Sequence, residues 1–321
     1  MEERNEKMVV PGDDPVMIAG SPHLDRLAPY GRVVLHDSRP DSTAEKVERA
    51  RGAAVIINTR GVVSWGREEF EQLPDLRMIT SCSIGTDMFD LEAAREHGIV
   101  ICNQPGRTAP VVAEHMFGLM FAAAKRAAFF TKRMQAGEWP RMNGIFLQGK
   151  VLGIVGAGNS GAEMARLGRA IGMDVIAWTY HPSQERAERL DVCFVTLDEL
   201  LSEADVVSMH VALTEDSRGM IGAREFGLMK DGAIVVNGAR GPVIDTDALV
   251  TALRSGRLGG AAIDVYDEEP VPPSHPLLSC EQVVLTPHCA DMTPEGVDLL
   301  NGGAVENVIA FLEGRPRNRV T

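Results

Sequence analysis

The fold is decided by the stretch Val151-Leu152-Gly153-Ile154-Val155-Gly156-Ala157-Gly158-Asn159-Ser160-Gly161. Its first five residues are apolar and favour a β-strand, which runs directly into Gly-x-Gly-x-x-Gly and then a helix. Gly156 permits the tight turn, Gly158 lets the backbone approach a phosphate, and Gly161 lets the helix pack against the strand. Free N–H groups at the helix start, around Asn159 and Ser160, attract an anion. The alternative is an ordinary glycine-rich turn, but strand, motif and helix together favour a dinucleotide site.

The alternation of strand and helix continues after this motif. Strands are predicted at Val151–Val155, Asp174–Thr179, Val192–Val195, Asp205–His210, Ala233–Val236, Ala261–Val265 and Val283–Leu285. Seven strands interleaved with helices indicate a doubly wound parallel sheet, with its ligand crevice at the carboxyl ends of the strands. The candidate site residues that follow these strands are Thr179, His181, His210, Ala239, Arg240, Asp264, Glu269 and His288.

Residues 1–103 form a second region of alternating strands and amphipathic helices. The predicted strands are Val16–Ala19, Arg32–His36, Ala53–Ile57, Leu76–Ser81 and Ile99–Cys102, and the predicted helices are Thr43–Arg51, Glu68–Leu73 and Leu91–His97. Helical crossovers imply another parallel sheet. A helix from about Pro110 to Arg126 is apolar on most of its circumference, so we expect it to be buried at a domain interface, a partner subunit or both. The segment Thr293–Leu312 predicts one more helix on the first domain.

Composition limits the class of protein. A chain of 321 residues with 45% hydrophobic content is long enough for two domains. We expect a cytoplasmic protein, because the sequence has no run of 18 apolar residues and begins with charged residues. Five cysteines without a Cys-x-x-Cys pair fit a reducing compartment and argue against disulfides or a metal site. A formal charge of −13 disfavours nucleic acid and anionic membrane as partners, so an anionic substrate needs a local basic group.

Three further motifs identify a family. They are Val235-Val236-Asn237-Gly238-Ala239-Arg240-Gly241, Ala261-Ala262-Ile263-Asp264-Val265-Tyr266-Asp267-Glu268-Glu269-Pro270 and Val284-Leu285-Thr286-Pro287-His288. Together they resemble the D-isomer-specific 2-hydroxyacid dehydrogenases, particularly the phosphoglycerate and glycerate dehydrogenases. The resemblance implies a Rossmann NAD(P)-binding domain over 104–290 and a flavodoxin-like substrate domain over 1–103 and 291–321. It also implies a homodimer with the Pro110–Arg126 helix at its interface.

The chemistry of 2-oxo acid reduction needs three kinds of group, and the residue types match them. Arg240 can hold a carboxylate and the adjacent oxygen with its planar fork. His288 can give a proton in one direction and take it in the other. Glu269 can orient the imidazole and favour its charged form. The family assigns the same catalytic roles to the matching positions. The non-functional alternatives are that Arg240 is a surface arginine, His288 a strand-end histidine and Glu269 part of an acidic loop.

Other residues are assigned by the resemblance or by their position in the chain. It implies that Asp264 contacts the nicotinamide carboxamide and that His210 lies at the cofactor cleft, although a strand-end histidine packing on the sheet is equally compatible. On the first domain, Ser83, Ile84 and Gly85 resemble the loop whose N–H groups bind the substrate carboxylate. Arg60 is a candidate for a second anionic group of the substrate. Met292 is expected either to line the distal end of the substrate or to fill the core, since both suit a methionine. His115 is expected to be a buried helix residue without a catalytic role, and Trp139 is expected to pack.

Two positions depart from the family pattern. The second cofactor-domain strand commonly ends in an acidic residue that binds the adenine ribose, but Thr179 stands there. The absence of this acidic residue removes the main basis for excluding NADP, so we expect the protein to use NAD or NADP with weak discrimination. Gly238 replaces a larger residue, which is expected to open space beside the nicotinamide.

The sequence therefore predicts an oxidoreductase that transfers a hydride between a nicotinamide cofactor and a D-2-hydroxy acid or its 2-oxo acid. One alternative is a phosphite-type dehydrogenase on the same scaffold. Formate oxidation is disfavoured because that branch lacks the acidic partner represented by Glu269. Another alternative is a nicotinamide-sensing, corepressor-like binding protein, for which turnover is the discriminating observation.

Overall fold

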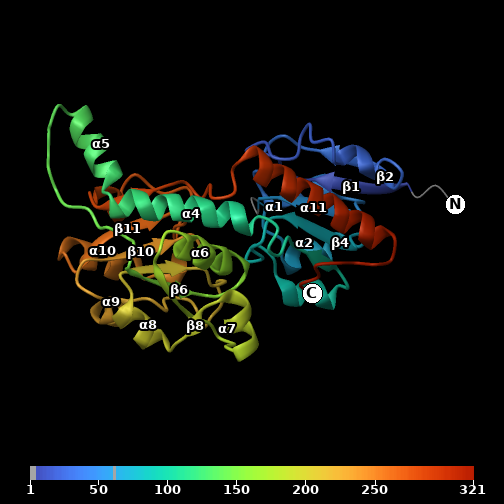
Figure 1. Cartoon of the computed structure of the whole chain (residues 1–321). Helices are drawn as coiled ribbons and strands as arrows, with labels where there is room; N and C mark the ends of the chain where they lie inside the picture. The colour runs from blue at the N-terminus through green and yellow to red at the C-terminus, as the bar shows by residue number, and fades with distance from the viewer. Residues whose placement is uncertain (1–4, 61–62) are drawn as a thin grey trace. The chain divides into compact units, whose positions relative to one another are not determined.

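The computed structural model describes residues 5–60 and 63–321. The chain forms two compact units. Unit 1 contains the described residues up to Thr108 together with Met292–Thr321, and unit 2 is Ala109–Asp291. Each unit is a parallel β-sheet with helices packed on it (Figure 1). The divisions fall after 108 and after 291, where the sequence predicted boundaries after 103 and after 290.

Unit 2 has a seven-stranded sheet in the order β12-β11-β10-β9-β6-β7-β8. Its strands are β6 (Val151–Val155), β7 (Asp174–Trp178), β8 (Cys193–Phe194), β9 (Val206–Met209), β10 (Ala233–Asn237), β11 (Leu258–Ile263) and β12 (Val283–Leu285). The order reverses between β6 and β9, as in the Rossmann fold, so the ligand crevice is expected at the carboxyl ends of these two strands. All seven predicted strands are confirmed, with small shifts of their ends.

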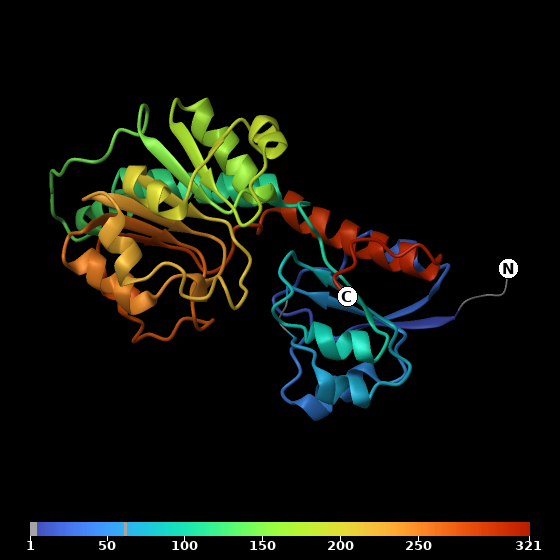
Figure 2. The same ribbon diagram turned by 90° about the horizontal axis from the view of Figure 1, so that it is seen from below.

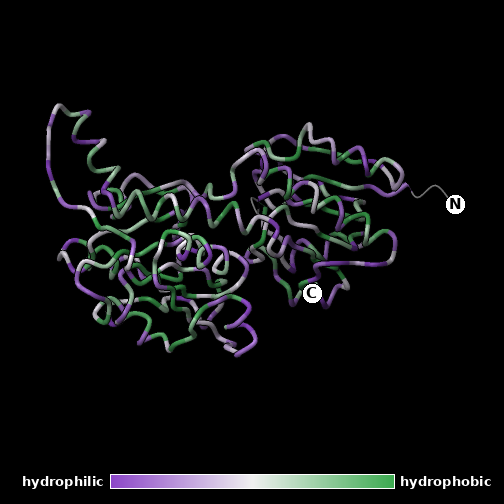
Figure 3. Tube along the Cα trace, in the orientation of Figure 1, coloured by the Kyte–Doolittle hydropathy of each residue, from purple (hydrophilic) through white to green (hydrophobic). Residues whose placement is uncertain are grey.

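Helices cover both faces of this sheet (Figures 1 and 2). They are α4 (Ala109–Ala124), α5 (Ala127–Gln135), α6 (Asn159–Ala170), α7 (Gln184–Leu190), α8 (Leu197–Glu203), α9 (Ala223–Leu228) and α10 (Thr246–Arg254), with short 3-10 turns at Gly241–Val243 and Pro276–Ser279. One core cluster joins α4 and α6 to the sheet, and a second joins α8, α9 and α10 to its other face. The strands are hydrophobic in Figure 3, whereas α7 is hydrophilic.

The helix predicted at Pro110–Arg126 is only partly buried within the chain. Its buried residues include Ala113, Met116 and Met120, whereas Gly118 is exposed. Arg126 adopts a left-handed conformation (φ 53°), which ends α4 and starts α5, a helix that the sequence did not predict. Within the single chain α4 is buried on one side only, and burial of its remaining surface by a partner subunit stays a prediction.

Unit 1 has a five-stranded sheet in the order β2-β1-β3-β4-β5, which is the flavodoxin order. Its strands are β1 (Glu6–Val10), β2 (Gly31–Leu35), β3 (Val55–Thr59), β4 (Met78–Cys82) and β5 (Val100–Cys102). The strand predicted at Val16–Ala19 was wrong. The buried Asp13 carboxylate accepts hydrogen bonds from the N–H groups of Met17, Ile18 and Ala19, which folds this apolar segment into a loop after β1.

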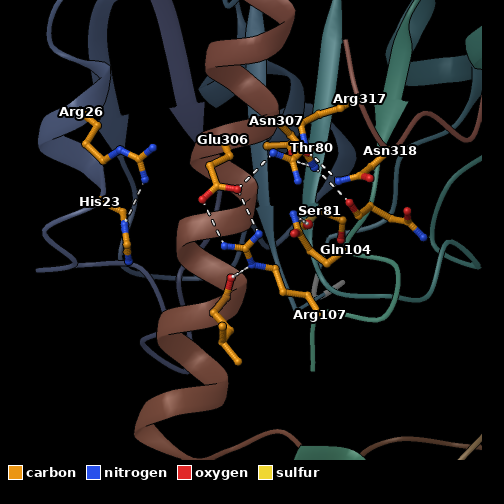
Figure 4. A network of polar contacts seen from close by, with 12 residues as sticks. His23, Arg26, Thr80, Ser81, Gln104, Arg107, Glu306, Asn307, Arg317 and Asn318 are labelled. Carbon is orange, nitrogen blue, oxygen red and sulfur yellow. Dashed lines mark hydrogen bonds and ion pairs between the residues drawn. The ribbon is translucent and has the colours of Figure 1, made fainter. Parts of the chain in front are cut away.

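The C-terminal helix α11 packs on unit 1, as predicted. The helices of unit 1 are α1 (Thr43–Ala50), α2 (Arg67–Glu71), α3 (Leu91–Glu96) and α11 (Pro294–Leu312), with a 3-10 turn at Leu24–Leu27. In Figure 4, Arg107 forms a bidentate ion pair with Glu306 of α11 at 3.0 and 3.1 Å, and Asn307 reaches Thr80 of β4. These contacts explain why residues up to Thr108 belong to unit 1. No helix in the described part of the chain has the length and apolar content needed to cross a bilayer.

Candidate active site

The glycine turn after β6 has the geometry that a pyrophosphate requires. Gly156 has a φ of +100°, and a Cβ there would lie 2.7 Å from the carbonyl carbon of His210. A Cβ at Gly161 would lie 2.1 Å from the Gly156 oxygen, so α6 packs closely on the turn. A Cβ at Gly158 would meet nothing within 4 Å, so the space above this residue is open. Because Gly158 caps α6 without a side chain, the N–H groups of Asn159 and its neighbours suit a bound anion. The turn therefore fits the phosphates of a dinucleotide.

The segment after β7 carries hydroxyl and imidazole groups where a ribose would bind. Thr179 is half-buried and His181 is exposed. Arg186 of α7 donates to the carbonyl oxygen of Ala157 at 3.0 Å and also to that of His181. Its guanidinium thus links the glycine turn to the β7 loop and places a positive charge between them.

His210 follows β9, the strand that lies beside β6 at the point where the strand order reverses. Its N–H donates to the Val155 oxygen at 2.7 Å, and its ring Nε2 lies 2.8 Å from the Ser208 hydroxyl. Desolvation lowers the pKa of His210 to about 4, so the ring is neutral near pH 7. The structure thus places His210 beside the glycine turn and also gives its ring a partner from β9.

Glu269 and His288 form a hydrogen-bonded pair, although they are nineteen positions apart in the sequence. His288 Nδ1 lies 2.7 Å from Glu269 Oε2, and the Tyr266 N–H donates to Oε1 at 2.9 Å. Burial raises the pKa of Glu269, but the hydrogen bond and charge of His288, the Tyr266 N–H and the charge of Arg240 outweigh it and hold the pKa below its usual value. The carboxylate is therefore ionised near pH 7 and orients the imidazole.

Arg240 ends a turn that the Asn237 side chain shapes. Asn237 is buried, accepts from the Ala239 N–H at 3.0 Å, and donates to the Arg240 oxygen at 3.0 Å. The next residue, Gly241, lies against Tyr266, because a Cβ there would be 2.0 Å from the Tyr266 carbonyl carbon. This close approach holds the Arg240 turn beside the segment that carries Glu269. Sequence reasoning missed Asn237 and Tyr266, although both belong to the quoted motifs.

Gly238 does not open space in this turn. A Cβ at Gly238 would lie 2.4 Å from the Met116 sulfur and 2.8 Å from its Cγ. The volume that a larger side chain would occupy is filled by α4, and this expectation from the sequence was therefore wrong.

Asp264 lies under the loop that carries His288. Its side chain is 1% exposed, and its oxygens accept from the Thr286 hydroxyl and from the N–H groups of Cys289 and Ala290. The contact to a nicotinamide carboxamide stays a prediction. His115 of α4 is partly exposed, not buried as the sequence predicted, and its Nε2 lies 3.5 Å from the Asp264 carboxylate.

The substrate-side candidates lie at the carboxyl ends of two neighbouring strands of unit 1. After β4, Ser83 bonds to the Ser81 hydroxyl at 2.6 Å and donates to the Gly85 oxygen at 3.2 Å, while the Ile84 oxygen accepts from Asn103 at 2.7 Å. The loop is therefore held by its own side chains and by the segment after β5.

Arg60 follows β3 in a left-handed conformation (φ 44°). Its Nη1 lies 2.8 Å from the sulfur of Met292. Because β3 and β4 pair in parallel, Arg60 and the Ser83–Gly85 loop share one edge of the unit 1 sheet.

A dinucleotide turn, an arginine and a carboxylate-bound histidine on a Rossmann sheet define a nicotinamide-dependent oxidoreductase. Residues 117–290 match the family model described as "D-isomer specific 2-hydroxyacid dehydrogenase, NAD binding domain". The chain belongs to the D-isomer-specific 2-hydroxyacid dehydrogenase family.

Three similar proteins show the extent of the relationship. The glyoxylate reductase of Aeropyrum pernix is 39% identical over 78% of this chain and 77% of its own length. The D-3-phosphoglycerate dehydrogenase of Archaeoglobus fulgidus is 39% identical over 83% of this chain, which spans about half (51%) of that longer protein. The crystal structure of a glyoxylate reductase from Paecilomyes thermophila has a TM-score of 0.88 at 30% identity, with 98% of both chains covered.

Proposed function

We propose that this protein interconverts a D-2-hydroxy acid and its 2-oxo acid by hydride transfer with NAD or NADP. The observation that carries the proposal is the Glu269–His288 pair at 2.7 Å, next to the Arg240 turn on a dinucleotide-binding sheet. The nicotinamide supplies or accepts the hydride. Arg240 binds the carboxylate and the adjacent carbonyl oxygen. His288 donates a proton to that oxygen during reduction and removes it during oxidation, while Glu269 holds the ring in place.

The direct test is to assay a panel of 2-oxo acids with NADH and with NADPH, monitoring each reaction by the absorbance of the reduced nicotinamide. Small substrates such as glyoxylate and hydroxypyruvate belong in the panel, as do substrates with a second anionic group. Consumption of reduced cofactor with a 2-oxo acid supports the proposal. Turnover of phosphite alone, or dinucleotide binding without any turnover, would contradict it.

We assign the two units different roles in this reaction. Unit 2 binds the dinucleotide through Gly156, Gly158, Gly161 and the residues around them. Unit 1 is the substrate domain, in which N–H groups of the Ser83–Gly85 loop bind the carboxylate. Arg60 serves an additional anionic group, because it follows β3 at the same sheet edge as this loop and carries a positive charge.

The choice of coenzyme is expected to be weak. Thr179 offers a hydroxyl to the ribose and does not repel a 2′-phosphate, while Arg186 places a positive charge beside the same loop. We expect kcat/KM values for the two coenzymes within about a hundredfold of each other. Thr179→Asp is expected to shift the preference toward NAD, because its carboxylate repels the phosphate.

Steady-state kinetics of both proteins with both coenzymes measure this prediction. Asp174→Asn, at the opposite end of β7, is a matched control and is expected to leave the preference unchanged. A wild-type preference for NAD above about a thousandfold would contradict weak discrimination.

We also propose that the protein is a homodimer. Residues 127–146, here named the arm, contain α5, which projects from the rest of unit 2 (Figure 1). The arm carries large exposed hydrophobic side chains, among them Trp139 (74% exposed) and Phe146 (69%). Such a concentration of exposed apolar area is typical of a protein interface.

All five cysteines, which lie in the described part of the chain, are free thiols, and this supports a cytoplasmic location.

Replacing Trp139 and Phe146 together with Ser is expected to dissociate this dimer. Aromatic anchors of an interface each contribute about 2 kcal/mol or more, so the dissociation constant should rise by at least about 10³-fold. Light scattering coupled to size exclusion gives the mass at several concentrations. Val16→Ser, which changes an exposed apolar residue of unit 1, is the control. A monomeric wild type, or a dimeric double variant, would contradict the role of the arm.

A further inference from the structure

We propose that Asp264, Thr286 and His115 form a positioning group that fixes the main chain on both sides of His288. This inference rests on the proposed function, in which His288 is the proton donor and acceptor. Asp264 directly follows β11, Thr286 directly follows β12, and His115 lies on α4, so the group connects three elements behind one reactive side chain. None of them needs to touch the substrate to affect the reaction.

The Asp264 carboxylate holds the loop at three points. Its Oδ1 accepts from the Thr286 hydroxyl at 2.5 Å and from the Cys289 N–H at 3.0 Å. Its Oδ2 accepts from the Ala290 N–H at 3.1 Å. Thr286 lies two residues before His288, and Cys289 directly follows His288. One buried carboxylate therefore fixes the backbone both before and after the histidine.

His115 completes the group from α4. Its Nε2 lies 3.3 Å from the Thr286 hydroxyl oxygen and 3.5 Å from Asp264 Oδ1. When Nε2 carries the proton, His115 donates to the Thr286 hydroxyl, which in turn donates to Asp264. Burial raises the pKa of Asp264, but the hydrogen bonds from His115, Thr286 and Cys289 outweigh it and hold the pKa below its usual value. The carboxylate therefore accepts these hydrogen bonds as an ion near pH 7.

The conformation of His288 explains why such a group is needed. His288 has a φ of 51°, in the left-handed region that side chains other than glycine rarely adopt. A strained backbone of this kind persists only where the surrounding contacts hold it. The Tyr266 hydroxyl adds a hydrogen bond to the Thr286 oxygen at 2.9 Å. The result is a ring whose Nδ1 is directed at Glu269.

A metal site is a weaker interpretation of the same residues. Ligand atoms of His115, Asp264 and Cys289 lie within 4.8 Å of one another. However, both Asp264 oxygens already accept hydrogen bonds from the loop, and a cation would have to displace them. We therefore assign the cluster to hydrogen bonding.

Thr286→Val tests the inference, because valine keeps the shape of threonine and removes its hydroxyl. We expect kcat to fall about tenfold to thirtyfold, which corresponds to the loss of a hydrogen bond to a charged group. The KM for the 2-oxo acid and the dissociation constant of the dinucleotide should change less than about threefold, since Arg240 and the glycine turn are untouched. Thr286→Ser restores the hydroxyl and should recover most of kcat. Thr251→Val, on the exposed side of α10, is the matched control.

A spectroscopic measurement separates this role from a general loss of stability. The Nδ1 proton of His288 is held against Glu269, and we expect it to exchange with solvent at least about fivefold faster in Thr286→Val, by NMR of the dinucleotide complex. His115→Leu should also speed the exchange of this proton, but by a smaller factor. It replaces Thr286→Val as the test if that variant does not fold. Wild-type kcat together with unchanged exchange in either folded variant would overturn the inference. If the wild type reduces no 2-oxo acid, the proposed function fails, while proton exchange still decides the positioning role.

Discussion

His288→Ala should lower kcat by about 10²–10⁴-fold and leave dinucleotide affinity nearly unchanged. This range is the usual contribution of a positioned general acid or base. The imidazole is the group that Glu269 orients, with 2.7 Å between Nδ1 and Oε2. The glycine turn that suits the phosphates is formed by other residues, so removing the ring does not alter it. The measurements are single-turnover kinetics with the best 2-oxo acid, and fluorescence titration with the reduced dinucleotide.

A histidine outside this site provides the control for that experiment. His36→Ala, in unit 1, should retain wild-type kcat. Turnover of His288→Ala within a few fold of wild type would show that another group supplies the proton. Loss of dinucleotide binding in the same variant would show instead that the loop, and not the acid, had been disturbed.

Arg240→Lys should lower kcat/KM for the 2-oxo acid by about 10²–10³-fold, with effects on both parameters. Lysine keeps the positive charge but cannot hold the carboxylate and the carbonyl oxygen with one planar group. The substrate then binds more weakly and is also misaligned, and a small misplacement is enough to cost about 10²-fold in rate. Both the rise in KM and the fall in kcat are measured in steady-state assays.

The fixed geometry of the turn makes this substitution informative. The Asn237 side chain bonds to the backbone of Ala239 and Arg240, so the turn itself does not depend on the guanidinium. Arg254→Lys, at an exposed position of the same unit, is the control and should behave like wild type. Unchanged kinetics of Arg240→Lys would remove this residue from the substrate site.

Much of unit 2 was predictable because its signals are local. Each strand is a short apolar run bounded by turn residues, and parallel strands bring the residues that follow them to a common edge. Glu269 and His288 were placed together on that basis, and the structure joins them by a hydrogen bond. The left-handed conformation of His288 had no such local signal.

The features that the sequence did not reveal depend on contacts between distant residues. The apolar run at Val16–Ala19 resembles a strand, but the Asp13 carboxylate binds its N–H groups. The end of α4 near Arg126 was predicted, but the second helix that begins directly after it, α5, was not. Similarly, nothing near His115 in the sequence indicates that it faces Asp264, because 149 positions separate the two residues and only the packing of α4 on the sheet brings them together.

Because Met116 fills the space above Gly238, we expect the effects of substitutions at these two positions to depend on each other. A side chain at position 238 requires the Met116 side chain to move or to be replaced by a shorter one. The effect of either substitution thus depends on the other, and single changes at one site sample only a part of the tolerated combinations. A program of directed evolution that aims to reshape the turn before Arg240 therefore has to vary both codons at once.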